Sequence, residues 1–472
     1  MREEEKMPRK NEYTGALNQF KRSLISGEKR YFDVSEFEEI VEQLMDEGDF
    51  QASEIAAFQG IQIHPNAIPL QLKYAQILLS KGKFNQSLKF LETAEKIDTH
   101  NPDIFLLKGS AHLLMGFEHK ALVYYREAIK YAGADLDDIL YQIGSTYAQT
   151  GNYSKAIYYF EKAVKANPGN DQALHDLGFF HDQQGNYRES IKYYDKYLDI
   201  EPFNPFVWFN LGSVYGKIGH YKKAINAFEF AYAIDDNFHQ VLMSIGNAYV
   251  SLGQFKNAAE KYQEFLAIEP KNDDANCFLA ECYLNMELHT LSEKHYRKAV
   301  AINPKNDTGW FGIGLNNWVA RNYKKAVEFV EKAINLYDKN SEYWLTLGKI
   351  HLDFKQKESA LKCLEKAVKQ DPENSEIWLT MAETYTTFSE LKNAIRVLQE
   401  GILTNNAVEI KYHLAGLLFT AKKKKLAHSI LKQALEQDSG EIEYFFAIYP
   451  QGLKSKKIQK IVANFRENEI PG

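Results

Sequence analysis

Small and large hydrophobic residues recur along this chain at an interval of 34 residues. When the sequence is aligned with itself at that interval, Gly212 matches Gly246 and Ala224 matches Ala258. Self-similarity on this scale is typical of a solenoid built from one repeated supersecondary unit. The pattern predicts twelve units, whose first helices open at Val34, Ile68, Pro102, Asp137, Asp171, Pro205, His239, Asp273, Asp307, Ser341, Ser375 and Val408.

Two places in each unit carry small residues and predict where two helices cross. The twentieth place is Ala or Ser in every unit, as in Ser190 and Ala224, and the eighth is Gly or Ala in all units except the first, which has Val41. Helices approach closely only where the side chains at the contact are small. Bulky residues at the twenty-fourth place, such as Tyr194 and Phe228, fill the space that the small residues leave.

Asparagine and proline mark the predicted helix ends. Good N-cap residues precede six first helices: Asn170, Asn204, Asn272, Asn306, Asn340 and Asn374. Prolines close the preceding second helices, because the residue before proline disfavours the α conformation: Pro168, Pro202, Pro270, Pro304 and Pro372. Tyr197 and Phe265 replace the small residue usual at the twenty-seventh place, and we expect local repacking around them.

These residues carry a family resemblance. The run Trp208, Leu211, Gly212, Tyr215, Ala224, Phe228 and Ala231 resembles the tetratricopeptide repeat (TPR), and the resemblance extends from residue 34 to about residue 441. It implies an all-α fold, the α-α superhelix of a TPR solenoid with about twelve helix-turn-helix repeats and terminal capping helices. The opening segment 31–39 is similar to the start of uncharacterised Bacteroidetes TPR proteins, which indicates a bacterial source.

The open ends of such an array need caps, because each unit buries only one side of its neighbour. We expect an N-terminal extension with a short amphipathic helix over 1–33, twelve tandem units over 34–441 and C-terminal capping helices over 442–472. The C-terminal cap has the apolar stripe Ile458, Ile461, Val462 and Phe465. A similar stripe near the amino end is made by Tyr13, Leu17, Phe20 and Leu24, and that helix either caps the array or docks in an acidic groove of its own or another copy.

The TPR resemblance implies that ligands lie in a concave groove, lined by places 2, 5, 6, 9, 12 and 13 of each first helix. Across the twelve units these places carry fifteen acidic residues and only three basic ones, Lys73, Lys217 and Lys349, although the whole chain has a net charge of −6. Six of the acids stand at place 2, where the helix dipole favours a carboxylate for any function. The remainder predicts either a groove for a basic or helical partner or a solvated acidic face.

Hydrophobic and aromatic residues occupy the same places in the middle of the array and are our candidate partner-binding residues: Tyr141, His175, Phe179, Phe206, Phe209, Met243, Phe278, Phe311, Leu315 and Trp318. Exposed aromatics in a concavity are candidate anchors for a peptide or a partner helix. Some of them would instead belong to packing between helices. The Lys and Asn of the family's chaperone-tail clamp are missing, since places 5 and 9 read Leu72 and Gln76 or Tyr141 and Ser145.

Catalytic, metal and cofactor sites find no support in the sequence. His175 and His181 would point about 240° apart on one helix, too far apart to share a metal ion. Gly312 and Gly314 lack the third glycine of a nucleotide-binding loop. Three cysteines cannot form a disulfide framework. The acidic balance argues against nucleic acid. No apolar segment reaches the roughly 18 residues of a membrane span, and none near Met1 forms a signal peptide, so we expect a cytoplasmic protein.

Together these features predict a non-enzymatic scaffold or adaptor that binds a peptide or partner helix in its concave groove, with no cofactor and no metal. Two alternatives remain open at this point. The chain could be a regulatory subunit of an enzyme complex, such as a glycosyltransferase or a signalling enzyme, or a structural oligomer that self-associates through its ends.

Overall fold

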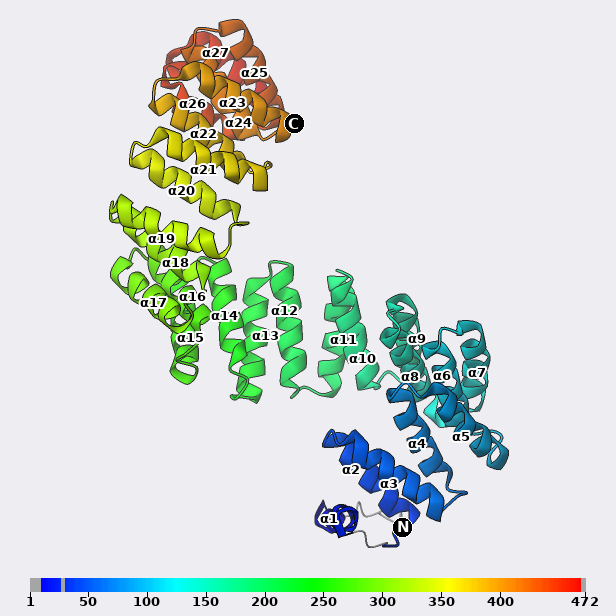
Figure 1. Ribbon diagram of the computed structural model, residues 1–472. Helices are drawn as coiled ribbons and strands as arrows, with labels where there is room; N and C mark the ends of the chain where they lie inside the picture. Colours follow the sequence, from blue (N-terminus) through cyan, green and yellow to red (C-terminus); the bar gives the residue numbers. More distant parts are fainter. Residues whose placement is uncertain (1–9, 27–29, 468–472) are drawn as a thin grey trace. The chain divides into compact units, whose positions relative to one another are not determined.

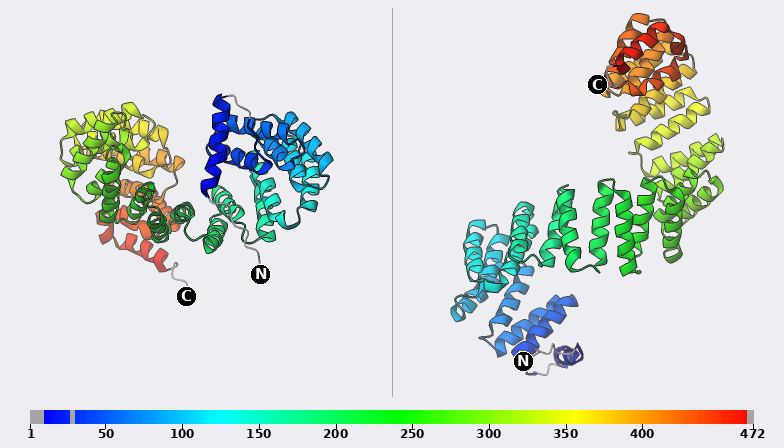
Figure 2. Two further views of the ribbon diagram at one scale, coloured as in Figure 1. Left: turned by 90° about the horizontal axis from the view of Figure 1, so that it is seen from below. Right: turned by 180° about the vertical axis from the view of Figure 1, so that it is seen from behind.

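The computed structural model describes residues 10–26 and 30–467, and over these ranges its regular secondary structure is entirely helical (Figure 1). The chain divides into two compact units, Met1–Asp236 and Asn237–Gly472. The all-α fold of paired helices predicted from the sequence is confirmed. In each unit the pairs stack one after another, as the further views in Figure 2 also show.

The helices of the amino-terminal unit are α1 (Lys10–Ser26), α2 (Val34–Asp46), α3 (Phe50–Ile63), α4 (Ile68–Ser80), α5 (Phe84–Ile97), α6 (Pro102–Leu114), α7 (Glu118–Tyr131), the 3-10 helix η1 (Gly133–Asp135), α8 (Leu136–Gln149), α9 (Tyr153–Ala166), α10 (Asp171–Gln183), α11 (Tyr187–Ile200), α12 (Pro205–Lys217) and α13 (Tyr221–Ile234).

The carboxyl-terminal unit contains α14 (Gln240–Ser251), α15 (Phe255–Ile268), α16 (Asp273–Asn285), α17 (His289–Ile302), α18 (Asp307–Val319), α19 (Tyr323–Leu336), α20 (Ser341–Asp353), α21 (Lys357–Gln370), α22 (Ser375–Thr387), α23 (Leu391–Thr404), α24 (Val408–Thr420), α25 (Lys424–Gln437), η2 (Gly440–Ile442), α26 (Glu443–Ile448), η3 (Pro450–Lys454) and α27 (Lys456–Glu467).

The helix boundaries agree closely with the repeat pattern. The first helices begin at the predicted residues except for α8 and α14, which each begin one residue away. All six predicted asparagines are N-caps whose side chains accept a hydrogen bond from a backbone N–H of the first turn. Each side chain therefore satisfies donors that the helix itself leaves without partners.

The predicted crossing of the two helices in each hairpin is confirmed. A Cβ atom added to Gly178 in α10 would lie 2.5 Å from the Tyr194 ring, and one added to Gly212 in α12 would lie 2.7 Å from the Phe228 ring. Ser190, at the twentieth place, donates a hydrogen bond of 2.7 Å to the carbonyl of Gly178. The two helices are this close because the ring of one helix occupies the space of the missing side chain on the other.

Two polar clasps join successive repeats and were not foreseen from the sequence. Asp137 accepts hydrogen bonds of 2.8 and 2.9 Å from the Asn167 and Asn170 amides. In the carboxyl-terminal unit, Asp273 likewise accepts from Asn303 and Asn306, both at 2.8 Å. Each clasp orients the asparagine that caps the next first helix, because Asn170 caps α10 and Asn306 caps α18. The clasp therefore links the start of one repeat to the start of the next.

The larger residues at the twenty-seventh place are accommodated by repacking. Tyr197 and Phe265 are both buried, and the Tyr197 hydroxyl accepts a hydrogen bond of 2.8 Å from Asn204, the N-cap of α12. The tryptophans at the fourth place show a similar link, since the Trp208 indole donates to the carbonyl of Pro202 at 2.8 Å. Bulky residues thus anchor the connections between repeats as well as the helices.

The terminal helices lie against the end repeats. In α1, Leu17 and Phe20 are buried and belong to one hydrophobic cluster with Phe37 of α2, whereas Leu24 is exposed. The side chain of Tyr13 lies outside the described residues. At the carboxyl end, Ile458 and Val462 of α27 are buried in the cluster of the last repeats, and Ile461 and Phe465 pack against it.

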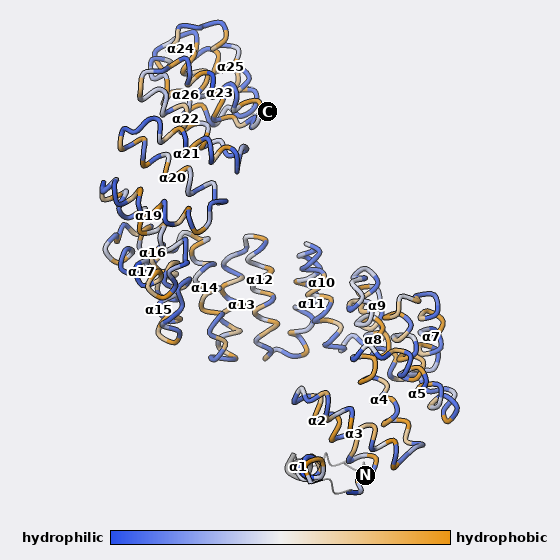
Figure 3. Tube along the Cα trace, viewed as in Figure 1, coloured by the Kyte–Doolittle hydropathy of each residue, from blue (hydrophilic) through white to orange (hydrophobic). Residues whose placement is uncertain are grey.

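Hydrophobic residues are distributed over all the helix pairs and do not collect in one segment (Figure 3). Over the ranges 10–26 and 30–467, none of the helices combines the length and the hydropathy that crossing a membrane requires.

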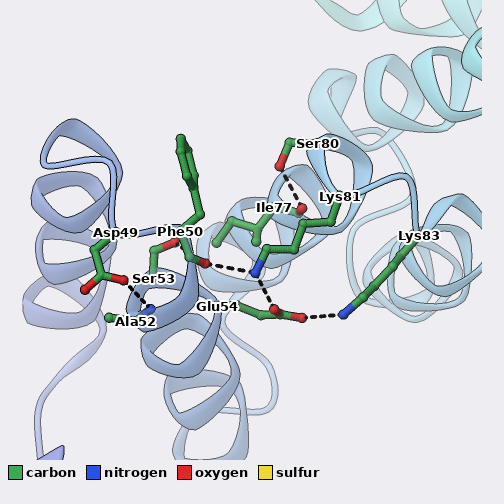
Figure 4. A network of polar contacts seen from close by, with 9 residues as sticks. All are labelled: Asp49, Phe50, Ala52, Ser53, Glu54, Ile77, Ser80, Lys81 and Lys83. Carbon is green, nitrogen blue, oxygen red and sulfur yellow. Dashed lines mark hydrogen bonds and ion pairs between the residues drawn. The ribbon is translucent and has the colours of Figure 1, made fainter.

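Charged residues also connect neighbouring repeats, as Figure 4 shows for the first two. Glu54 of α3 accepts hydrogen bonds from Lys81 at 2.5 Å and Lys83 at 2.9 Å, and Lys81 also donates to the carbonyl of Phe50 at 2.9 Å. The hydrogen bonds from Lys81 and Lys83 lower the pKa of Glu54. The network fixes the turn between α4 and α5 on the hairpin of the first repeat.

Candidate partner-binding surfaces

The first helices of neighbouring repeats contact one another within each unit. In the amino-terminal unit α2 contacts α4, α4 contacts α6, α6 contacts α8 and α10 contacts α12, whereas no two second helices pack comparably in the described part of the chain. A stack whose first helices are closer together than its second helices is concave on the first-helix side. We call the surface formed there by places 2, 5, 6, 9, 12 and 13 the first-helix face.

Side chains of the first-helix face in the amino-terminal unit bind one another across repeats. Lys217 forms an ion pair of 2.7 Å with Asp182, and Lys73 pairs with Glu42. The Tyr141 hydroxyl lies 3.3 Å from Asp176, to which it donates. These contacts join successive first helices, so the six places predicted from the repeat register lie on one continuous face of this unit.

The carboxyl-terminal unit shows the same pairing. Lys349 of α20 forms an ion pair of 2.6 Å with Glu376 of α22. The Trp318 indole of α18 donates a hydrogen bond of 2.8 Å to Asp353 of α20. All three lysines of the predicted groove places are therefore bound to an acid of an adjacent repeat, which leaves twelve of the fifteen acids without a lysine from this face.

The predicted aromatic residues of the amino-terminal unit differ in how much of their surface they offer. Phe179 is 42% exposed and Phe206 is 59% exposed, so both present apolar area on α10 and α12. Tyr141 and Phe209 are half-buried, with their rings against Phe160 and Phe228 of the second helices. His175 is also half-buried and lies 3.2 Å from the carboxylate of Asp176.

In the carboxyl-terminal unit, two of the five predicted residues are packing residues. Met243 is 6% exposed and Phe311 is 7% exposed, and the Phe311 ring stacks on Tyr343 with ring centres 4.5 Å apart. The expectation that these two residues face a partner is corrected here, because neighbouring helices cover them. Phe278, Leu315 and Trp318 are half-buried and keep part of their surface on the face.

A pocket of about 400 Å³ opens on the first-helix face of the amino-terminal unit, between α4, α6 and α8. Its apolar part is formed by Leu79, Leu107 and Leu114. Its other lining residues are polar apart from the Tyr141 ring, with amides and hydroxyls: Gln76, Ser80, Ser110, Tyr141, Gln142, Ser145, Thr146 and Gln149. The pocket carries no charged side chain, so it suits a ligand that offers hydrogen bonds and apolar groups.

A second pocket of about 460 Å³ lies on the first-helix face of the carboxyl-terminal unit, between α20, α22 and α24. The ion pair Lys349–Glu376 and the side chains of Glu383 and His413 give it charge, and Ile448 of α26 forms part of its wall. Burial lowers the pKa of His413. The two pockets thus occupy corresponding faces but have different chemistry.

Three carboxylates of the first-helix face have a pKa above the usual value. Burial raises the pKa of Glu38, although Lys73 opposes the shift, and burial together with the nearby Glu42 raises the pKa of Glu39. In the carboxyl-terminal unit, burial and the charge of Glu342 raise the pKa of Glu281. A cation that approached these carboxylates would restore the stability of their charged form.

The other candidate chemistry of the sequence is accounted for by packing. His181 is buried with its ring stacked on Tyr193 at 5.5 Å, and Gly312 lies in α18 where an added Cβ would be 2.2 Å from the Tyr296 ring. The three cysteines are buried. In the described ranges, no three His, Cys, Asp or Glu side chains are placed to hold a metal ion.

The polar lining of the first pocket was missed at the level of the sequence. Gln76, Ser110 and Ser145 stand at the ninth place of three successive units, and Gln149 stands at the thirteenth place of the third. A run of uncharged polar residues at one repeat place was the available signal. By itself, this run indicates only that the chaperone-tail clamp is absent.

Three family models match the chain and together extend from residue 106 to residue 444. They are the Cilia and flagella-associated protein 70 C-terminal domain over residues 234–444, the Anaphase-promoting complex, cyclosome, subunit 3 over residues 149–231, and the Tetratricopeptide repeat over residues 106–171. No curated protein matches the chain.

Solved structures with similarity to the chain include several TPR proteins. A TPR protein from Parabacteroides merdae is 20% identical, with 52% of this chain and 98% of that chain covered and a TM-score of 0.44. The C-terminal part of a TPR protein from Cytophaga hutchinsonii is 18% identical, covers 51% and 99%, and has a TM-score of 0.43. The Cut9–Hcn1 assembly of the APC/C is 12% identical, covers 91% and 96%, and has a TM-score of 0.40.

TPR arrays are generally non-catalytic scaffolds for protein–protein interaction. The matching repeat families, the helix pairs and the glycine–aromatic crossings agree with one another, and the chain is a tetratricopeptide-repeat protein.

Proposed function

We propose that this protein is a non-enzymatic cytoplasmic adaptor that binds a peptide or a helix of a partner protein on the first-helix face. The observation that carries the proposal is the pocket between α4, α6 and α8, which is lined by residues of three successive first helices. Amides and hydroxyls there can bind the backbone or polar side chains of a peptide, and three leucines can bury an apolar anchor.

Charge supports a basic partner. Twelve acids of the first-helix face form no ion pair with a lysine of that face, and burial raises the pKa of Glu38 and Glu39 in the first repeat. A positively charged segment would lower this electrostatic free energy and would associate faster at low salt. Phe179 and Phe206 on the same unit offer the exposed aromatic area that interfaces use as anchors.

The test uses a pair of matched variants. Gln142 is an exposed pocket residue, and Gln142→Trp would fill the pocket, whereas Gln86→Trp places the same side chain on the exposed surface of the second helix α5. Partners captured from the native lysate by the wild type should be lost from Gln142→Trp and retained by Gln86→Trp. Both variants should keep the circular dichroism of the wild type.

A third variant, Phe179→Arg, tests the aromatic contribution without filling the pocket. It should weaken capture of the same partner, because it removes exposed apolar area and adds a charge. If the partner is retained by Gln142→Trp and by Phe179→Arg, the first-helix face of this unit is not the binding site and the proposal fails.

A further inference from the structure

A third pocket, of different character, lies at the carboxyl end of the array. It has a volume of about 530 Å³ and is formed by the end of α24, the start of α25, the segment after η3 and the start of α27. Phe419 and Tyr449 line it with stacked rings whose centres are 5.2 Å apart. Phe419 is buried and Tyr449 is half-buried, so Tyr449 supplies the accessible aromatic surface. Lys424, Lys425 and Lys457 line it as well. The pocket therefore combines aromatic surface with concentrated positive charge.

Within the described residues, no ion pair neutralises this charge. Residues 422–460 contain nine lysines and four acids. In the part of the chain that the structure describes, none of the nine forms an ion pair, whereas the lysines of the first-helix face are all paired. Lys422–Lys425, Lys454, Lys456, Lys457 and Lys460 are all exposed. The positive surface around the pocket is thus available to an anionic partner.

Helix stability does not explain these lysines. Lys424 and Lys425 stand in the first turn of α25, and Lys456 and Lys457 stand in the first turn of α27. The helix dipole disfavours cations at this end, so each lysine there reduces helix stability. The residue before α25, Lys423, provides no side-chain cap. A carboxylate from outside would pair with the lysines and accept hydrogen bonds from the uncapped backbone N–H groups.

The opposite charge is concentrated in the first repeat. Residues 31–72 contain no lysine or arginine and nine acids: Asp33, Glu36, Glu38, Glu39, Glu42, Asp46, Glu47, Asp49 and Glu54. Glu42, Glu47 and Glu54 pair with lysines of the same unit. In the described ranges Glu38, Glu39 and Asp46 form no ion pair, although all three lie on α2.

The same repeat also carries an apolar anchor. Phe50 follows Asp49 at the start of α3 and is 51% exposed, and in Figure 4 its ring points away from the polar network around Glu54. An aromatic side chain flanked by carboxylates matches a pocket that has aromatic surface and a lysine rim. This complementarity of charge and apolar surface identifies a second copy of the chain as an occupant with the required chemistry.

We propose that the basic pocket of one copy binds the acidic first repeat of another, with Phe50 near Tyr449 and the carboxylates of α2 near Lys424, Lys425 and Lys457. Such an interface joins two different surfaces, so it is heterologous, and a dimer held by one such contact has one free end of each kind. The protein then assembles head to tail. The interface takes up carboxylates of the first-helix face on α2 but includes none of the residues that line the pocket between α4, α6 and α8.

Sedimentation velocity of the full chain tests the proposal. The wild type should form dimers and longer assemblies as its concentration rises at low salt, and these should dissociate at high salt because exposed charges are screened. A basic-end variant with Lys424→Glu, Lys425→Glu and Lys457→Glu should raise the dissociation constant by more than about tenfold, the equivalent of losing about 1.4 kcal/mol. An acidic-end variant with Glu38→Lys, Glu39→Lys and Asp46→Lys should show the same loss.

Mixing provides the decisive control. The acidic-end variant keeps its basic pocket but carries lysines on α2, and the basic-end variant keeps its acidic repeat but carries glutamates at the pocket. An equimolar mixture of the two should form dimers through the two intact ends. It should also associate through the two altered ends, whose charges are reversed but still opposite.

A variant with the same change of charge at exposed lysines elsewhere, Lys222→Glu, Lys324→Glu and Lys369→Glu, should assemble like the wild type. A wild-type chain that stays monomeric at low salt would overturn the proposal. So would assembly that the basic-end variant leaves intact. Binding of the basic end to duplex DNA or to phosphatidylserine vesicles, without self-association, would assign the pocket to another class of partner and equally refute it.

Discussion

The two units build the same hairpin turn with different residues. At the fifteenth place, the amino-terminal unit has glycine in every repeat, with φ between 71° and 83° in Gly48, Gly82, Gly116, Gly151, Gly185 and Gly219. The carboxyl-terminal unit has glycine only in its first repeat. Its other five repeats place a non-glycine residue at φ between 59° and 63°: Glu287, Arg321, Lys355, Ser389 and Lys422.

The comparison shows that the turn is imposed by the packing of the two helices and not by glycine. The left-handed conformation costs a residue with a Cβ about 1 kcal/mol or more, yet five such residues keep it. Two later crossings of the same unit are also filled differently. Val330 and Leu364 stand at the place that holds Tyr194 and Phe228 in the amino-terminal unit, whereas Tyr262 keeps an aromatic ring there. We expect the strain and the packing of the two units to respond differently to matched substitutions.

The largest expected effect should be equal in both units and tests what they share. Asp137→Ala and Asp273→Ala each leave two asparagine amides without their acceptor, and each should lower the free energy of unfolding by about 2 kcal/mol. Urea denaturation followed by circular dichroism measures the loss of unfolding free energy, and hydrogen exchange shows which repeats lose it. Asp137→Asn keeps an acceptor oxygen, so it should lower the free energy of unfolding less than Asp137→Ala does. An equal decrease in the two variants would contradict the role of the clasp.

The clasp also predicts a pH dependence. Burial opposes the shift, but the hydrogen bonds from Asn170 and Asn167 lower the pKa of Asp137. A carboxyl whose pKa is lower in the folded state contributes stability that is present above its unfolded pKa and is lost as the pH falls through the folded pKa. The Ala variant should therefore lose less stability than the wild type in acid.

A smaller effect should separate an aromatic crossing of the amino-terminal unit from an aliphatic crossing of the carboxyl-terminal unit. Gly178→Ala places a methyl group 2.5 Å from the Tyr194 ring, whereas Gly348→Ala places one 2.8 Å from the side chain of Leu364, which can rotate. Overpacking against the ring exceeds the gain of about 1 kcal/mol in helix propensity, so Gly178→Ala should destabilise by about 1.5 kcal/mol. Gly348→Ala should be nearly neutral. Similar unfolding midpoints for the two variants would show that the aromatic crossings are no stiffer than the aliphatic ones.

Acid should weaken the carboxyl-terminal unit through one histidine. Burial, with help from Lys298 and Lys294, lowers the pKa of His295 from 6.5 to about 4. The unfolded chain therefore binds a proton near pH 6.5 that the folded chain binds only near pH 4, and stability falls between these values. Since solvent screens this half-buried group, we expect a loss of about 1 kcal/mol.

The variant His295→Gln can still bond to Asn276, which lies 3.0 Å from the histidine ring nitrogen. It should flatten the dependence of unfolding free energy on pH between 6.5 and 4 in the carboxyl-terminal unit. Hydrogen exchange at α16 and α17 over this range is the measurement. An unchanged slope would assign the acid sensitivity of this unit to its carboxyl groups.

The smallest expected effect tests the turns themselves. Lys355→Gly removes the Cβ from a residue at φ 63° and should stabilise by about 0.5 kcal/mol, because relief of strain exceeds the entropy that glycine adds to the unfolded chain. Gly185→Ala, at φ 75°, should destabilise by about 1 kcal/mol. Thermal unfolding of both variants measures these changes in stability. Destabilisation by Lys355→Gly would mean that the lysine side chain makes contacts that offset its backbone strain.

Much of the fold could be predicted because the repeat places each make local demands. The N-cap asparagines, the small residues at the crossings and the prolines after the second helices all act within one hairpin, so their spacing alone predicts helix boundaries. The candidate site was predictable only in part. Register placed Tyr141 and Asp176 on one face, but it could not tell that Met243 and Phe311 are covered by neighbouring helices.

The sequence by itself therefore determined the period, the helix pairs and the identity of the first-helix face, because these depend on residues within one or two repeats. Only the tertiary structure decided which side chains remain exposed, which lysines are bound to acids and which helix starts meet at the basic pocket. Burial and charge neutralisation depend on how a side chain meets the next repeat, and the position of a residue within its own repeat does not fix that contact.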